Sequence, residues 1–147
     1  MKEQLFEACK KYLDQRINRI LEAMKDLEES LQNESKSSAG DKYETGREMI
    51  NLEFDKLTTQ LTEFRKLEGT LTMAWRKTPA KNIQLGSLVK TSVANYFIAI
   101  PAGEISDGNE KFYAIGANSP VAQALLGKKE KESFNFNGNT NEILLVE

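Results

Sequence analysis

Two long apolar stripes occupy the N-terminal half of the chain, and each has the spacing of an amphipathic helix. The first stripe advances by three or four positions at a time: Phe6, Cys9, Leu13, Ile17, Ile20, Met24, Leu27 and Leu31. The second does the same: Ile50, Phe54, Leu57, Leu61, Phe64, Leu67 and Leu71. Steps averaging about 3.5 residues keep one seam of a helix against a partner, so the pattern predicts a two-helix coiled coil.

A polar segment near residues 34–46 interrupts both stripes and predicts the tip of a hairpin. Two amphipathic helices joined by a short polar segment favour an antiparallel arrangement. We expect the first helix to run to about Asn33 and the second from about Asp41 to Arg76. At about 1.5 Å per residue, roughly thirty residues give a helix about 45 Å long. Residues 1–76 are therefore predicted to form a long hairpin with an exposed polar tip.

The period changes from about 3.5 to 2 after a proline-containing segment at residues 77–82, which we interpret as a linker. Alternating apolar residues predict strands near 85–90, 95–100 and 111–115, with a turn at Asp107-Gly108. Asn137-Gly138 lies between alternating apolar residues, which is typical of a tight β-hairpin. Residues 83–147 therefore predict a small, mostly antiparallel sheet, and the whole chain an α+β protein.

One short helix is predicted inside this second region, over residues 119–127. Ser119 suits the N-cap position, because its hydroxyl can accept a hydrogen bond from an unpaired backbone N–H. Pro120 suits the first helical turn, and Gly127 suits the left-handed residue that follows a helix. Both ends of the helix are thus defined by the sequence.

The composition narrows the possible chemistry. The 147-residue chain has no histidine and one cysteine, so it lacks the commonest general base and metal ligand. Cys9 lies on the first apolar stripe, which favours a packed core thiol over a nucleophile or a disulfide partner. A net charge of −2 gives no overall attraction to nucleic acid. If the protein acts on nucleic acid, we expect it to do so through another protein.

Nothing in the sequence predicts a membrane segment. No apolar run approaches the roughly twenty residues that span a bilayer. The N-terminus carries mixed charge from its second residue and lacks the apolar segment of a signal peptide. We expect a cytoplasmic protein, and a monomer, because the two stripes can pack against each other within one chain.

Asp41 and Glu44 are candidates for chemistry at the tip, and two interpretations of them stay open. An Asp followed three positions later by a Glu is a capping box, which stabilises a helix start. The same two carboxylates could supply part of a Mg²⁺ site, because Mg²⁺ takes about six oxygen ligands and often uses one or two carboxylates. The other ligands would then come from a second protein, with Lys36, Lys42 and Arg47 nearby to attract phosphates.

Several motifs, in the same order along nearly the whole chain, resemble the bacterial Gre transcript-cleavage factors. They are the coiled coil, the tip motif Gly40-Asp41-Lys42-Tyr43-Glu44, and the segment from Ser119 to Lys129 with its Leu-Leu-Gly-Lys motif. The closing pattern Phe134-x-Phe136-x-Gly138-x-x-x-Glu142-Ile143-x-x-Val146 also fits that family. The most specific parts are the tip motif and the Ser-Pro helix.

The resemblance implies a transcription elongation factor that is not itself an enzyme. Gre factors dock on RNA polymerase through an FKBP-like C-terminal domain, here residues 83–147, and place their coiled coil in the secondary channel. Tip carboxylates, here Asp41 and Glu44, help the polymerase hold a catalytic Mg²⁺ that cuts backtracked RNA. The resemblance implies no tightly bound metal in the free protein, and contact with nascent RNA only through the polymerase. The polymerase-binding segment would contain six residues: Ser119, Pro120, Leu125, Leu126, Gly127 and Lys128.

The chain departs from the family pattern in two places. Thr45-Gly46-Arg47-Glu48 follows the tip glutamate where the family usually has Asn-Ala-Glu-Tyr, and Lys131-Glu132 replaces a usual Gly-Asp turn. Gly46 costs a helix roughly 1 kcal/mol relative to alanine. Two alternatives therefore stay open: a regulator that occupies the channel without stimulating cleavage, and a coiled-coil adaptor unrelated to transcription.

Overall fold

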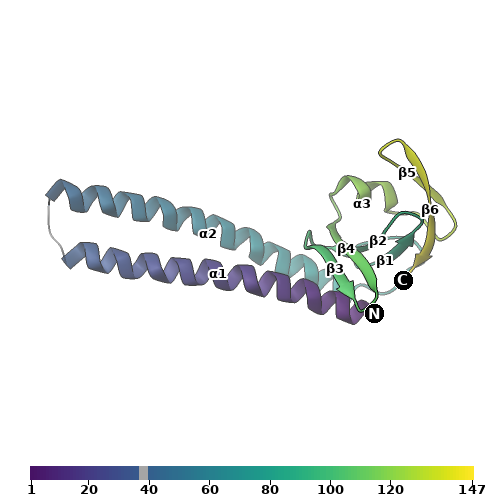
Figure 1. Ribbon diagram of the computed structural model, residues 1–147, viewed down its shortest axis with the longest axis horizontal. Coiled ribbons are helices and arrows are strands. Elements are labelled where there is room, and N and C mark those ends of the chain that lie inside the picture. Colours follow the sequence, from purple (N-terminus) through teal and green to yellow (C-terminus); the bar gives the residue numbers. More distant parts are fainter. Residues whose placement is uncertain (37–39) are drawn as a thin grey trace. The chain divides into compact units, whose positions relative to one another are not determined.

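The computed structural model describes residues 1–36 and 40–147, without the side chains of residues 34–43 and 107 (Figure 1). The chain forms two compact units. Residues Leu13–Lys66 make up one unit, whose described residues are all helical. The other contains Met1–Tyr12 and Leu67–Glu147, so that it combines the ends of both helices with the sheet. Within the described ranges, no helix is both long and apolar enough to cross a bilayer.

The predicted helical hairpin is confirmed. Helix α1 spans Lys2–Lys36 and α2 spans Gly40–Arg76. Leu13, Ile17 and Ile20 are buried on α1, and the stripe residues of α2 from Ile50 to Leu67 are half-buried. The burial follows the stripe period, so the apolar seam holds the two helices together.

A six-stranded mixed sheet follows the hairpin, in the order β3-β4-β2-β1-β6-β5. The elements of this region are β1 (Leu88–Thr91), β2 (Asn95–Ala99), β3 (Gly103–Asp107), β4 (Glu110–Gly116), α3 (Pro120–Leu125), β5 (Ser133–Phe136) and β6 (Asn139–Val146). The predicted α+β class is therefore confirmed. Asn137 and Gly138 both have positive φ, 54° and 79°, as a tight turn between β5 and β6 requires.

The sheet contains one feature that alternation alone did not predict. Strands β2 and β4 pair in parallel, whereas the other neighbouring strands pair antiparallel. The chain reverses after β2 and again after β3, so β4 runs in the same direction as β2. Strand β3 was not predicted, because Ile105 is the single large apolar residue of Gly103–Asp107 and is buried. A strand at the edge of a sheet can form with so few apolar residues.

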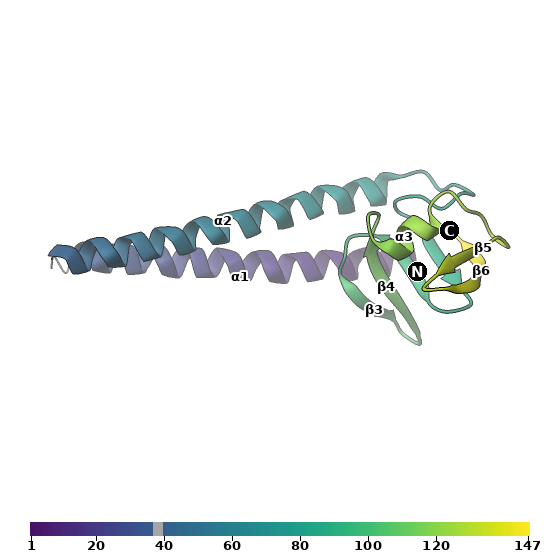
Figure 2. The ribbon, with the colours of Figure 1, turned by 90° about the horizontal axis from the view of Figure 1, so that it is seen from above.

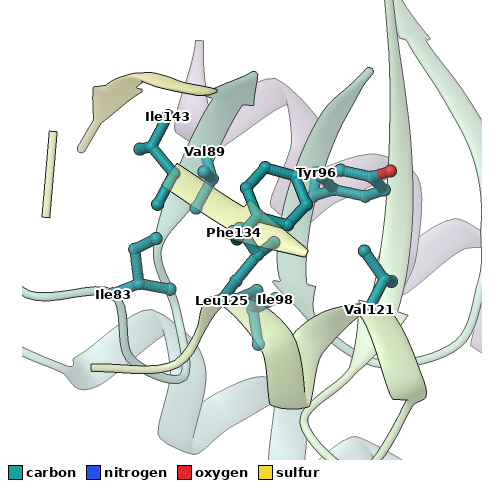
Figure 3. Close-up of a cluster of buried hydrophobic side chains, with 8 residues drawn as sticks. All are labelled: Ile83, Val89, Tyr96, Ile98, Val121, Leu125, Phe134 and Ile143. Atoms are coloured by element: carbon teal, nitrogen blue, oxygen red, sulfur yellow. The ribbon is translucent and has the colours of Figure 1, made fainter. Parts of the chain in front are cut away.

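One face of the sheet packs against α3 through a cluster of buried apolar side chains (Figure 3). The cluster consists of Ile83, Val89, Tyr96, Ile98, Val121, Leu125, Phe134 and Ile143. Leu125, Ile98 and Ile143 are fully buried. These residues come from α3, from four strands and, for Ile83, from the segment before β1, so the cluster fixes the position of the short helix on the sheet.

The opposite face of the sheet is buried as well. Leu88, Phe97 and Phe112 alternate with the residues of the cluster and are at most 1% exposed. The compact unit that contains them also holds the ends of α1 and α2, and Figures 1 and 2 show the start of α1 beside β3 and β4. We conclude that the helix ends cover this face of the sheet.

The helix ends have their own closely packed contacts. Leu5 and Cys9 on α1 are fully buried, and Leu71 and Ala74 on α2 are nearly so. The ring of Phe6 lies 4.6 Å, centroid to centroid, from the ring of Trp75. Trp75 itself remains 46% exposed. The aromatic pair is therefore at the edge of the packed region.

Gly86 lies where α2 closely approaches the chain that enters the sheet. Its φ of +93° is in the left-handed region, and a Cβ at this position would collide with the carbonyl oxygen of Ala74. Its backbone N–H donates to the carbonyl of Ile98 at 2.7 Å. This turn explains why β1 begins at Leu88 and not at the predicted residue 85.

The Gly86→Ala variant should lose at least about 2 kcal/mol of unfolding free energy, because the added methyl group meets backbone and the φ angle disfavours alanine. Gly69→Ala is the matched control. Gly69 lies in α2 with open space around it, so alanine should raise stability by about 0.5–1 kcal/mol. Urea denaturation of both variants measures the difference, and equal effects of the two substitutions would contradict the packing described.

Cys9 should make stability depend on pH in the alkaline range. Burial raises the pKa of its thiol from 9.0 to about 12. The unfolded chain therefore ionises at lower pH than the folded one, and the stabilising contribution is present below pH 9 and lost as pH rises towards 12. The difference in unfolding free energy between wild type and Cys9→Ala, measured by urea denaturation from pH 8 to 11, should shrink as pH rises. A constant difference would show that Cys9 is ionised equally in both states.

Candidate functional site

The predicted tip carboxylates occupy the first turns of α2. The helix begins at Gly40, one residue before Asp41, and continues without interruption through Gly46. Glu44 is exposed, whereas the side chain of Asp41 is outside the described part of the structure. The pairing of the two carboxylates and the capping box therefore stay predictions. The helix dipole stabilises acidic residues in the first turns of a helix, whether they serve as metal ligands or as a helix cap.

Glu44 has the exposure that a ligand shared with another protein requires. Where side chains are described, no three histidine, cysteine, aspartate or glutamate residues come together as a metal site. Glu44 and Asp41 are three positions apart in one helix, and such positions are neighbours on a helix surface. A carboxylate pair of this kind supplies hard oxygen ligands but leaves most positions of an octahedral ion open.

The second predicted site begins at the capped N-terminus of α3. The hydroxyl of Ser119 accepts a hydrogen bond from the backbone N–H of Ala122 at 3.3 Å and donates to the carbonyl of Gly116 at 2.8 Å. The Gln123 side chain donates to the carbonyl of Ala117 at 2.7 Å. These bonds confirm Ser119 as the N-cap and hold the exposed Pro120 in a defined position.

The C-terminal end of α3 is fixed by the chain that leaves α2. The backbone N–H of Gly127, which has a φ of +85°, donates to the carbonyl of Ile83 at 2.9 Å. The N–H of Ile83 in turn donates to the carbonyl of Lys128 at 2.8 Å. The Leu-Gly-Lys segment is therefore paired with residues about 45 positions earlier. The side-chain amide of Asn82 adds a hydrogen bond to the carbonyl oxygen of Gly127 at 3.1 Å. The structure brings all six predicted docking residues together on and around one short helix.

These six residues differ in what they offer a partner. Pro120 and Gly127 are exposed, and Ser119, Leu126 and Lys128 are half-buried. Leu125 is fully buried in the core cluster. Any contribution of Leu125 to docking would therefore act through the position of α3, since its side chain does not reach the surface.

Two hollows in the structure did not emerge from the sequence. In the helical unit, Leu27, Leu31, Ile50 and Phe54 line a cavity of about 230 Å³ between α1 and α2. In the unit that contains the sheet, a groove of about 440 Å³ lies where the segment after α2 meets the segment after α3. The two segments that form the groove are about 45 positions apart in sequence, so no local pattern predicts it.

Comparisons with known proteins leave the family unassigned. No protein-family model matches the chain, and a search of the curated proteins finds no match.

Ser119→Ala should lower the unfolding free energy by about 1 kcal/mol, because the backbone N–H of Ala122 loses its cap. Ser106→Ala on the exposed part of β3 is the control and should stay within about 0.3 kcal/mol of wild type. Urea denaturation at pH 7 measures both. An effect of Ser119→Ala no larger than that of the control would mean that the cap does not stabilise α3.

Proposed function

We propose that this protein is an accessory factor of bacterial RNA polymerase, of the Gre type, which stimulates the polymerase to cut backtracked RNA. The observation that carries the proposal is the position of the Asp-x-x-Glu pair, in the first turns of α2 next to the polar segment that joins two long helices. The capped α3, with its Ser-Pro start and Leu-Gly-Lys end, supports it. On this proposal the protein is a cytoplasmic monomer and not an enzyme by itself.

The carboxylates would act as part of a shared metal site. Mg²⁺ fits two carboxylate ligands, and when bound it would activate water for phosphodiester hydrolysis. Asp41 and Glu44 leave about four ligand positions, which the polymerase and its substrate would fill. The Glu44 carboxylate is exposed and would therefore be accessible to a partner's site. The free protein would accordingly hold no metal tightly.

Docking would use the surface around α3. Pro120 at its start and Lys128 after its end flank the helix, and both ends are fixed by hydrogen bonds. A surface held in this way loses little conformational entropy on binding. We propose that the whole sheet region is an FKBP-like docking domain, with nascent RNA reached only through the polymerase.

A second candidate is a regulator that occupies the same channel without stimulating cleavage. Acidic residues in the first turns of α2 are already stabilised by the helix dipole, and Thr45-Gly46 departs from the family pattern after the tip. Binding to the polymerase would then survive the loss of both carboxylates, and the wild-type protein itself would not stimulate cleavage.

The test is transcript cleavage in a stalled, backtracked elongation complex of bacterial RNA polymerase. We expect wild-type protein to shorten the RNA, and Asp41→Asn/Glu44→Gln to reduce the rate by at least about 100-fold, because removing a charge that stabilises the transition state typically costs that much. The amides keep hydrogen-bonding atoms for the helix start, so the melting temperature should change little.

Glu53→Gln/Asp55→Asn is the matched control, since both residues are exposed on the same helix away from its start. It should cleave like wild type. Binding to the polymerase with no cleavage by wild-type protein would favour the non-catalytic regulator. Failure to bind polymerase at low salt would leave the adaptor alternative and refute the proposal.

A further inference from the structure

The cavity between α1 and α2 has apolar walls and one ionisable side chain. Its volume is about 230 Å³, and its lining residues are Leu27, Glu28, Leu31, Ile50, Asn51 and Phe54. The four apolar residues belong to the two stripes and are half-buried, whereas Glu28 and Asn51 are exposed. The cavity therefore combines an apolar interior with a polar rim.

The size of the cavity favours a small molecule. Its walls are residues 27–31 of α1 and 50–54 of α2, which is about one turn of each helix and about 6 Å along the axis. A partner helix bound in a groove uses anchor residues spread over two turns or more. An apolar cavity of about 150 Å³ lined by similar side chains can hold a benzene molecule. The cavity is therefore long enough for one aromatic ring and too short for a helix.

The charge at the cavity and around it is negative. Among the described lining residues, Glu28 is the single ionisable one. Residues 26–33 and 48–55, which contain both walls, have no lysine or arginine and six exposed carboxylates: Asp26, Glu28, Glu29, Glu48, Glu53 and Asp55. When the three adjacent cations, Lys25, Arg47 and Lys56, are included, an excess of three negative charges remains. The lining and its surroundings therefore both favour a cation.

We propose that this cavity binds a small organic cation in which an ammonium group is joined to one aromatic ring. The ring would occupy the apolar interior, where its burial supplies most of the affinity and its edge or face meets the ring of Phe54. The ammonium group would lie at the rim beside the Glu28 carboxylate. A ligand with a carboxylate would be repelled by Glu28, and a neutral ligand would lack the charge complementarity.

This inference goes beyond the proposed polymerase function and does not depend on it. The lining residues include neither of the tip carboxylates and none of the six docking residues. A variant of Glu28 therefore tests the cavity without removing a group that the proposed function uses. Ligand binding without transcript cleavage, and cleavage without ligand binding, are separate results.

The probe is phenethylammonium, titrated to millimolar concentrations into the full chain at pH 7 and low salt, and followed by NMR shifts of the backbone amides. The shifts should saturate and be largest at residues 27–31 and 50–54. Glu28→Gln should weaken binding by about 2- to 5-fold, as expected for the loss of one exposed ion pair. Methylammonium, which lacks the ring, should give no saturable shifts at the same concentrations.

Glu7→Gln is the matched control, because it removes the same charge from an exposed position of α1 about 30 Å from Glu28 along the helix. It should bind phenethylammonium like wild type, and thermal melting should confirm that both variants fold. Shifts that do not saturate, or equal affinities of the two variants, would overturn the proposal. Binding of phenylpropionate or of phenethyl alcohol as tight as that of phenethylammonium would also overturn it, because the positive charge would then play no part.

Discussion

The burial of both faces of the sheet is the constraint on which the rest of the structure depends. One face needs α3, which closes over the cluster around Leu125 and Ile143. The other needs apolar cover from the ends of α1 and α2, where Leu5, Cys9 and Leu71 are buried. A six-stranded sheet with an uncovered apolar face would lose much of the hydrophobic stabilisation that offsets its conformational entropy. The helix ends are therefore part of the folded unit that contains the sheet.

That constraint also explains where the candidate sites lie. Gly86 lets α2 approach the sheet closely, and Ile83 then pairs with both Gly127 and Lys128. The same pairing fixes the end of α3 and brings together the two segments beside the groove lined by Lys81 and Lys129. The proposed chemistry at the start of α2 belongs to the other compact unit, whose described residues are helical. The protein thus separates residues that would hold a partner from residues that would act on its substrate.

Much of this fold could be predicted from the sequence, because the relevant signals are local. The apolar stripes determine the helices and their seam, Ser119 and Gly127 determine the ends of α3, and Asn137-Gly138 determines a hairpin. The parallel pairing of β2 with β4 could not be predicted, since it depends on which strands become neighbours after two chain reversals. Strand β3 was missed because Ile105 is its single large apolar residue, which is too little for a periodic signal.

The candidate sites were predictable in part, for a similar reason. The Asp41 and Glu44 pair and the Ser119–Lys128 segment are continuous in sequence, so spacing reveals them. The groove that Lys81, Lys129, Glu130 and Glu147 line joins segments that are distant in sequence and are brought together by hydrogen bonds near Ile83. Leu125 could not be separated from its exposed neighbours without the structure, since a short helix gives too few turns to define its buried face.

The central claim is that the carboxylates at the start of α2 help the polymerase hold a catalytic Mg²⁺. The most direct measurement is the cleavage rate of a backtracked complex as a function of Mg²⁺ concentration, with and without this protein. The account predicts that the protein lowers the Mg²⁺ concentration needed for half-maximal cleavage, and that Asp41→Asn/Glu44→Gln removes this shift. An unchanged Mg²⁺ dependence, or a shift that persists in the variant, would contradict it.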